Sequence, residues 1–195
     1  MNRMCSVNLL FIAVALVAFP LTSQADLLDN PSFETGDFTG WEKAADIVNS
    51  WGDAWIWEDA GDHLGDIHSG TYCIGAGMGG GNPEGTVSVW QDVNIRGKCQ
   101  EGDVITFSAW TKGDGDFASG GTAWLELEFK DSGLNVIKTY KSRTRDGVYD
   151  YVQDELSCPV PEGAVYVSAV FVVHSFGGSV GMDDASLTVN SKPWI

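Results

Sequence analysis

The sequence predicts an all-β fold, a β-sandwich of the jelly-roll kind made of two antiparallel sheets. Three observations lead to this prediction. Short segments alternate apolar and polar residues and are rich in Val, Ile, Thr and aromatic side chains. The 24 glycines fall mostly between these segments, where turns require them. Helical periodicity is almost absent beyond the apolar N-terminus, which argues against a helical fold.

Each predicted strand carries β-branched or aromatic residues and is bounded by Gly, Asp, Asn or Pro. In chain order the predicted strands are 47–49, 72–76, 87–95, 104–111, 123–129, 136–140, 151–158, 165–174 and 182–189. Regular spacing of short strands with turn residues between them is typical of sandwiches.

Alternation along three of these strands assigns side chains to faces, because successive residues of a strand point to opposite sides. The apolar set should face the core, and it comprises Ile105, Phe107, Ala109, Leu125, Leu127, Phe129, Val165, Val167, Ala169 and Phe171. The outward set is then Trp110, Trp124, Glu126, Glu128, Tyr166 and Ser168.

The first 25 residues read as a secretory signal peptide. Arg3 precedes an apolar run at 9–19, and Ser23-Gln24-Ala25 places small residues where a signal peptidase cleaves. A membrane anchor is less favoured, because the run is shorter than the roughly 20 residues a spanning helix needs. We therefore expect a secreted protein with one sandwich domain at 26–190 and a short tail at 191–195.

Acidic residues dominate the charge: 27 Asp and Glu stand against 11 Lys and Arg, a net of −16. A field of this sign repels polyanions, so we expect neither a nucleic-acid partner nor a membrane partner. The eight Trp residues are more than a core of this size usually needs. Some of them should therefore work at a surface.

Three cysteines remain after signal cleavage removes Cys5. Cys99 and Cys158 each stand just ahead of a Glu-Gly turn and a strand, and this likeness suggests a disulfide between them with Cys73 free and buried. Spacing does not give connectivity, so three unpaired thiols are the alternative.

Six short motifs, in order, resemble carbohydrate-binding modules of families four, nine and twenty-two, which belong to the galactose-binding-like jelly rolls. They cover residues 27–189 and read Leu28-Asp-Asn-Pro-Ser-Phe-Glu34 followed by Gly36 and Gly40-Trp41, His68-Ser-Gly-Thr-Tyr72, Val89-Trp-Gln-Asp-Val93, Gly102-Asp-Val-Ile-Thr-Phe-Ser-Ala-Trp-Thr-Lys112, Val160-Pro-Glu-Gly-Ala164 and Met182-Asp-Asp-Ala-Ser-Leu187. The resemblance implies a galactose-binding domain-like fold more strongly than it implies a ligand.

The resemblance also implies a structural calcium ion that ties the first strand to the last. Its ligands would be the backbone carbonyls of Ser32 and Gly70, the carboxylate of Glu34, and the side chain and carbonyl of Asp184. Hard oxygen ligands of these kinds suit Ca²⁺. The alternative is that Glu34 and Asp184 are ordinary acids at strand ends.

A sugar site is expected where outward aromatics adjoin acids, because a pyranose packs its C–H face on an indole while carboxylates accept its hydroxyl hydrogen bonds. Parity favours Trp124, Glu126 and Tyr166. The resemblance adds Trp55 and Trp57 as a cleft wall and Gln91 as a polar contact. Trp90 points opposite to Gln91, so only one of the two can face the ligand sheet. By the same resemblance Trp41 and Trp110 are packing residues.

The predicted function is a secreted, non-catalytic, monomeric protein that binds a neutral polysaccharide or oligosaccharide. A structural or adhesion protein of the same fold is the alternative, and a glycoside hydrolase or lyase is the third possibility. Catalysis is disfavoured because Glu126 and Glu128, neighbours on one strand, do not straddle a bond as a hydrolase pair must. A lyase would need more basic residues than this chain has.

Overall fold

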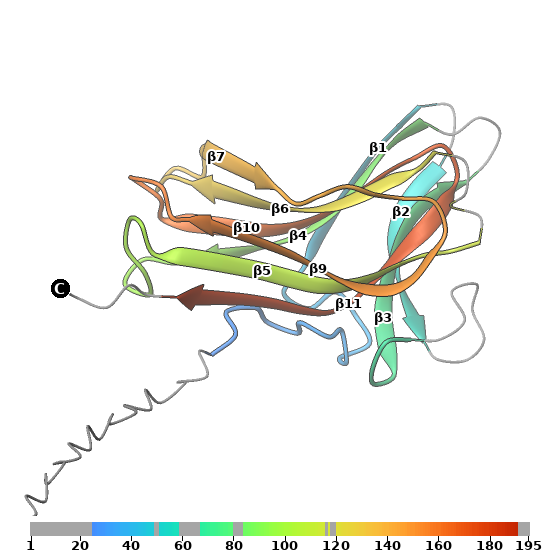
Figure 1. Cartoon of the computed structure of the whole chain (residues 1–195), viewed down its shortest axis with the longest axis horizontal. Helices are drawn as coiled ribbons and strands as arrows, with labels where there is room; N and C mark the ends of the chain where they lie inside the picture. Colours follow the sequence, from blue (N-terminus) through green and yellow to red (C-terminus); the bar gives the residue numbers. More distant parts are fainter. Residues whose placement is uncertain are drawn as a thin grey trace, which may run out of the picture.

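The structure, a computed structural model, describes residues 25–48, 51–58, 67–79, 84–115, 117 and 120–190, and it is a β-sandwich (Figure 1). Eleven strands lie in these residues, and every pairing between them is antiparallel. They are β1 (Glu42–Val48), β2 (Trp51–Glu58), β3 (Tyr72–Gly79), β4 (Glu84–Asn94), β5 (Val104–Gly113), β6 (Thr122–Lys130), β7 (Val136–Lys141), β8 (Arg145–Asp146), β9 (Tyr149–Pro159), β10 (Tyr166–Ser175) and β11 (Gly178–Asn190).

Two sheets stack face to face. The six-stranded sheet has the order β1-β4-β10-β6-β7, with β8 paired to β6, and the five-stranded sheet has the order β2-β3-β11-β5-β9 (Figure 1). Every neighbour in the central part of each sheet is distant in sequence, as in a jelly roll. The predicted fold class, a sandwich of two antiparallel sheets, is confirmed.

The core lies between the sheets and follows the predicted alternation. Phe107 on β5, Leu127 on β6 and Phe171 on β10 are completely buried there. Val165 alone of the inward set is only partly buried, since it precedes β10. The opposite parity of β4, β6 and β10 is therefore free to form the outer face of the six-stranded sheet.

The largest difference from the predicted strands is in β1 and β2, which the expected strand 47–49 barely touches. β1 is an edge strand whose residues 42–46 are all exposed, so polar and apolar residues do not alternate along it. In β2 the alternation is present, with Ala54 and Ile56 toward the core, but glycine and acids disguise it. Asn49 lies outside the described residues.

The N-terminal segment 25–41 is bound to the sandwich rather than free. The Leu27 N–H donates to the Leu187 carbonyl at 2.9 Å, and the Leu187 N–H donates to Asp26 Oδ1 at 3.0 Å. Further along, the Ala185 N–H donates to the Pro31 carbonyl at 3.0 Å. The segment therefore runs beside β11, in the five-stranded sheet (Figure 1).

The predicted disulfide between Cys99 and Cys158 is wrong in this structure, where both are free thiols. Cys158 points into the core from β9, and burial raises the pKa of its thiol to about 11. The Cys99 thiol instead points back into its own turn, 3.8 Å from the Ile95 carbonyl oxygen. Cys73 is free and buried, as expected.

Some predictions concern segments outside the described residues. They are the signal peptide up to residue 24 and the tail 191–195. Within the described part of the chain, no helix is long and apolar enough to cross a membrane.

Candidate functional site

Strand register aligns side chains in rows across the outer face of the six-stranded sheet. One row runs from Glu42 on β1 to Trp90 on β4, Val170 on β10, Glu126 on β6 and Lys141 on β7. Because directly paired residues share a face, this row places an indole, an aliphatic side chain, a carboxylate and an ammonium group side by side.

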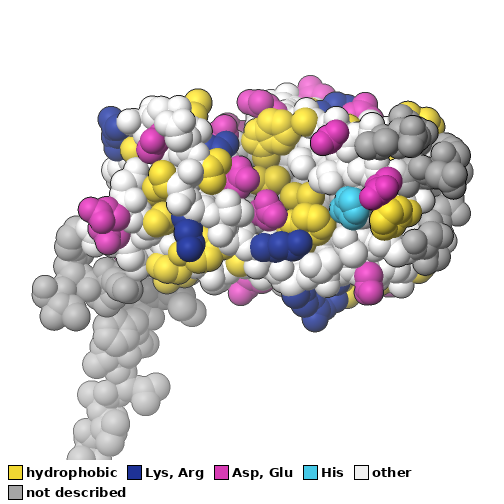
Figure 2. Space-filling view, turned by 90° about the horizontal axis from the view of Figure 1, so that it is seen from above, with side chains coloured by type: hydrophobic (Ala, Val, Ile, Leu, Met, Phe, Trp, Pro, Cys, Tyr) yellow, Lys and Arg dark blue, Asp and Glu magenta, His cyan; other side chains and the backbone are white. Residues whose placement is uncertain are grey.

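The two adjoining rows complete the face. On one side Asp92, Ser168 and Glu128 are aligned on β4, β10 and β6. On the other side the aligned residues are Ala44, Ser88, Val172 and Trp124. Acidic groups therefore border a central apolar strip, and Figure 2, which looks onto this face, shows hydrophobic side chains gathered beside Asp and Glu.

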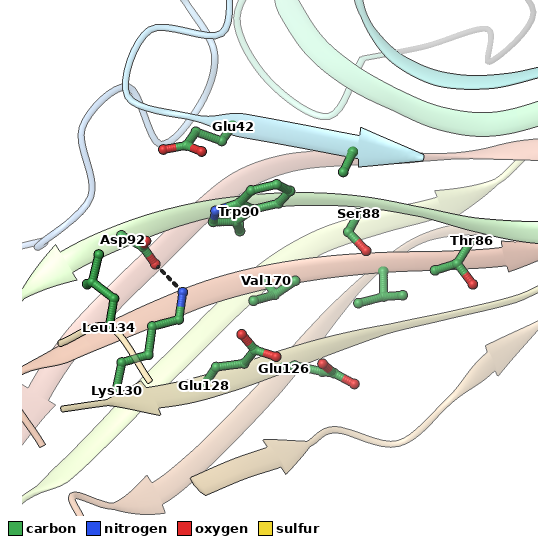
Figure 3. A pocket seen from close by; sticks show the side chains of 12 residues that line it. Glu42, Thr86, Ser88, Trp90, Asp92, Glu126, Glu128, Lys130, Leu134 and Val170 are labelled. Atoms are coloured by element: carbon green, nitrogen blue, oxygen red, sulfur yellow. Dashed lines mark hydrogen bonds and ion pairs between the residues drawn. The ribbon is translucent and has the colours of Figure 1, made fainter. Parts of the chain in front are cut away.

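A groove of about 640 Å³ lies over these rows. Val170 and Val172 form its floor; they are only 6% and 5% exposed although they face away from the core. Trp90 and Glu42 rise on the β4 and β1 side, and Glu126 and Glu128 rise on the β6 side (Figure 3). The groove thus has an apolar floor, one aromatic wall and one acidic wall.

One end of the groove is fixed by a polar network. Lys130 Nζ lies 2.9 Å from Asp92 Oδ1, and the Ser168 hydroxyl donates to the same oxygen (Figure 3). Burial raises the pKa of the half-buried Glu128, and the nearby Glu126 and Asp92 charges add to that effect while Lys130 opposes it. This end therefore holds carboxylates that are costly to desolvate further without a donor.

Trp124 lies on the predicted face, next to the groove rather than in its lining. Its indole N–H donates to Glu126 Oε1 at 2.6 Å. Lys141 Nζ lies 3.3 Å from its ring centre, a cation–π contact. Trp124 therefore orients Glu126, and its own ring face is covered by Lys141.

The open choice between Trp90 and Gln91 is resolved in favour of Trp90. Gln91 points inward and is 5% exposed. Its Oε1 accepts from the Asp29 N–H at 2.7 Å and its Nε2 donates to the Asp29 carbonyl at 2.9 Å. The expectation that Gln91 contacts sugar is thus corrected, because both ends of its amide hold the N-terminal segment.

Trp55 and Trp57 do not share a wall with Trp124. They project from β2 on the outer face of the five-stranded sheet, where Trp57 is 5% exposed and lies over Gly75. Trp55 meets Trp57 edge to face at 5.5 Å between ring centres. Their assignment to the same cleft is therefore wrong, since the two sheets turn these faces in opposite directions.

Tyr166 lies on the correct face but at its margin. It is paired with Lys130 on β6, one row beyond Glu128, and does not line the groove. Glu42 and Asp92 also line the groove, and neither was expected from the sequence. Asp92 could have been predicted, because it lies two residues after Trp90 on β4 and so points to the same face. Glu42 could not, because β1 has no apolar alternation that predicts a strand.

Of the residues predicted to bind calcium, Glu34, Gly70 and Asp184 lie at the 67–72 loop, whereas Ser32 follows Pro31, whose carbonyl accepts from the Ala185 N–H. The Glu34 carboxylate accepts from the Thr71 and Tyr72 N–H groups at 2.9 to 3.0 Å. Gly70, with φ of 69°, lies directly against that carboxylate, where a Cβ atom would come within 2.3 Å of Glu34 Oε1. Backbone donors alone therefore already stabilise the Glu34 charge.

A β-bulge brings two successive acids of β11 to the same loop. Register shifts between Asp183 and Ser186, and Asp184 has a φ of 44°. His68 Nδ1 lies 2.7 Å from Asp184 Oδ2, and Ser69 contributes its hydroxyl to Asp184 and its N–H to Asp183. Ligand atoms of His68, Asp183 and Asp184 lie within 4.8 Å of one another, and Glu34 is not in that group.

Trp110, expected to serve packing, lies on the outer face of the five-stranded sheet. The His68 ring stacks on it at 4.1 Å between ring centres, with 17° between the planes. Tyr151 meets His68 edge to face at 5.2 Å. These aromatic contacts hold the 67–72 loop against β5 and β9.

No family model matches the sequence, and no curated protein matches it. Solved structures do share the fold. The enzymatically active domain of tailspike protein 4 from bacteriophage CBA120 has a TM-score of 0.65 at 13% identity; the match covers 84% of this chain and 21% of that one. The chain thus spans about a fifth of the tailspike domain.

Two further structures match as isolated or linked modules. TmCBM61, solved with β-1,4-galactotriose, has a TM-score of 0.56 at 20% identity, and the match covers 84% of this chain and 97% of that one. The CBM22-1 and GH10 modules of Clostridium thermocellum xylanase 10B, solved with xylohexaose, have a TM-score of 0.59 at 16% identity over 88% of this chain and 30% of that one. The chain therefore has the fold of the β-sandwich carbohydrate-binding modules.

Proposed function

We propose that the protein is a secreted, non-catalytic carbohydrate-binding protein whose groove receives a neutral oligosaccharide or polysaccharide segment. The observation that carries the proposal is the groove itself, with Trp90 and an apolar floor facing Glu126 and Glu128. A sugar ring has an apolar C–H face and a rim of hydroxyl donors, which match an indole and carboxylates respectively.

The structural neighbours support this proposal, since modules of the same fold have been solved with galactotriose and with xylohexaose. The arrangement of acids supports binding without bond cleavage. Glu126 and Glu128 lie on one wall rather than on both sides of a bond. Across the groove Asp92 is paired with Lys130, and Glu42 lies three strand spacings from Glu126, roughly 14 Å, which exceeds the separation of roughly 10 Å at most in a glycosidase pair.

The decisive variant is Trp90→Ala. Removing a central aromatic anchor should weaken binding of the best neutral oligosaccharide about tenfold or more, measured by isothermal titration calorimetry against xylo-, gluco- and galacto-oligosaccharides. Trp51→Ala is the matched control, because Trp51 is exposed on β2 of the other sheet. Equal losses in both variants, or none in Trp90→Ala, would contradict the assignment.

An adhesion role is the second candidate, and one observation favours it. Leu134, Val136 and Ile137 are all exposed on or beside β7, an edge strand. Unpaired edges with apolar side chains can add a partner strand. Absence of glycan binding together with concentration-dependent self-association or capture of a protein partner would favour this role. New reducing ends from a polymer substrate would favour a hydrolase instead.

We also propose a structural Ca²⁺ ion near the 67–72 loop. Support comes from the kind of donors present, since Asp183 and Asp184 bring carboxylate oxygens to this loop and Ca²⁺ prefers oxygen ligands. Glu34 is the weakest of the expected ligands, because backbone N–H groups already occupy its oxygens. Chelation should lower Tm, and restored Ca²⁺ should return it; an unchanged Tm would oppose the proposal.

A further inference from the structure

Among the described residues, three of the four carboxylates that line the groove form no salt bridge. Asp92 forms the salt bridge with Lys130. Glu42, Glu126 and Glu128 form no salt bridge within the described part of the chain. Since Lys130 is the one cationic side chain of the lining, the groove carries a net of three negative charges.

Lys141 does not cancel this charge by an ion pair. Although it is paired in register with Glu126, its ammonium group lies over the Trp124 ring instead. The remainder of the molecule adds to the same field, with a net charge of −16. A ligand therefore meets negative potential both on approach and inside the groove.

The negative charge of the groove lies where the substituents of a bound sugar ring would lie. β4 and β6 are both neighbours of β10, so Trp90 and Glu126 are separated by two strand spacings, roughly 10 Å. A sugar ring on Val170 beside Trp90 would direct its edge groups toward the Glu126 and Glu128 side chains (Figure 3). An ammonium group at that edge could donate to both carboxylates.

We propose that the groove prefers oligosaccharides of amino sugars with free, protonated amines over their N-acetylated or neutral counterparts, and that it excludes uronic acid oligomers. This inference rests on the proposed function, because it assumes that the groove is the sugar site. An ammonium group forms charge-assisted hydrogen bonds to carboxylates, and these are stronger than the hydrogen bonds that hydroxyls donate to the same groups. A uronate in the same place would add a further negative charge to a wall that already has two.

The test measures the binding of four hexasaccharides to the full secreted chain by calorimetry. They are the hexamers of glucosamine, N-acetylglucosamine and galacturonate, and cellohexaose. At low salt the glucosamine hexamer should bind about tenfold more tightly than the neutral hexamers, and galacturonate should not bind. High salt should shrink that advantage, because the carboxylates are only partly buried.

In the Glu126→Gln/Glu128→Gln double variant the ratio of glucosamine-hexamer affinity to cellohexaose affinity should fall to about one, because an amide oxygen still accepts a hydroxyl hydrogen bond but forms no charge-assisted bond to an ammonium group. Glu155→Gln is the control for overall charge, since it removes one negative charge at an exposed position on β9 of the other sheet, and it should keep the advantage. Circular dichroism melts would establish that both variants fold.

Each contrary result has a separate meaning. Equal affinity for glucosamine and cellohexaose would overturn the amine preference and leave the proposed function standing. An advantage that falls as much in Glu155→Gln as in the groove variant would overturn it too, since attraction would then come from overall charge. Failure of every hexasaccharide to bind would instead contradict the proposed function.

Discussion

At the scale of the residue, the role of each side chain in or beside the groove depends on which neighbouring side chains already contact it. Asp92 is committed to Lys130 and Ser168, and Trp124 is committed to Glu126 and Lys141. Among the described residues, no cation or aromatic ring covers Trp90, and its side chain lines the groove. An aromatic residue that looks equivalent in sequence can thus be a platform or a support, depending on what its neighbours do.

Glu128 offers a prediction about pH. Burial raises its pKa above the ordinary 4.5 in the folded state, so its ionisation favours unfolding, and stability is lost as pH rises from the ordinary value through the raised one. Glu128→Gln should therefore raise Tm at neutral pH, and the gain should vanish below pH 4.5. Thermal melts across pH, with Glu155→Gln as control, would measure it; a gain that persists in acid would refute this account.

At the scale of the element, one amide side chain of β4 adds to the hydrogen bonds that attach the N-terminal segment. Gln91 holds both the N–H and the carbonyl of Asp29 from within β4. Gln91→Ala would remove two hydrogen bonds made by a buried side chain and should cost about 2 kcal/mol of unfolding free energy. Denaturant unfolding would measure the loss, and Gln153→Ala, an exposed position on β9, should cost far less. Similar losses of unfolding free energy in the two variants would show that the hydrogen bonds between Gln91 and Asp29 add little stability.

The same element shows how far sequence reasoning reaches. Alternation correctly placed the inward faces of β5, β6 and most of β10, because apolar residues at every second position leave one solution. Alternation did not reveal β1, because an exposed edge strand needs no apolar alternation. The inward direction of Gln91 was also missed, because the backbone group that hydrogen-bonds to its amide lies 62 residues away.

The candidate site was predictable in part for the same reason. Parity on β6 gave Trp124, Glu126 and Glu128 on one face, and all three lie there. Which Trp lines the groove depended on side-chain contacts between strands, such as Lys141 on β7 over Trp124 on β6, and periodicity within one strand does not give these contacts. Trp55 and Trp57 were misplaced because no local pattern tells which of two sheets a strand joins.

At the scale of the whole molecule, the net charge of −16 should act on stability. Self-repulsion favours the expanded chain, and salt screens it. Sodium chloride should therefore raise Tm gradually, over the range in which the screening length falls to about 8 Å. Differential scanning calorimetry in chelator would measure this without divalent ions. A Tm that is flat or falling with salt would show that local ion pairs outweigh the global field.

The attachment of the N-terminal segment to β11 has a practical consequence for immobilised formats. Leu27 and Asn190 belong to the two ends of the described chain, and the hydrogen bonds of Leu187 with Leu27 and Asp26 keep those ends side by side. Both ends belong to the side of the five-stranded sheet, whereas the groove opens on the outer face of the other sheet (Figure 1). A biosensor surface or fluorescent reporter coupled through either end would leave the groove facing the analyte.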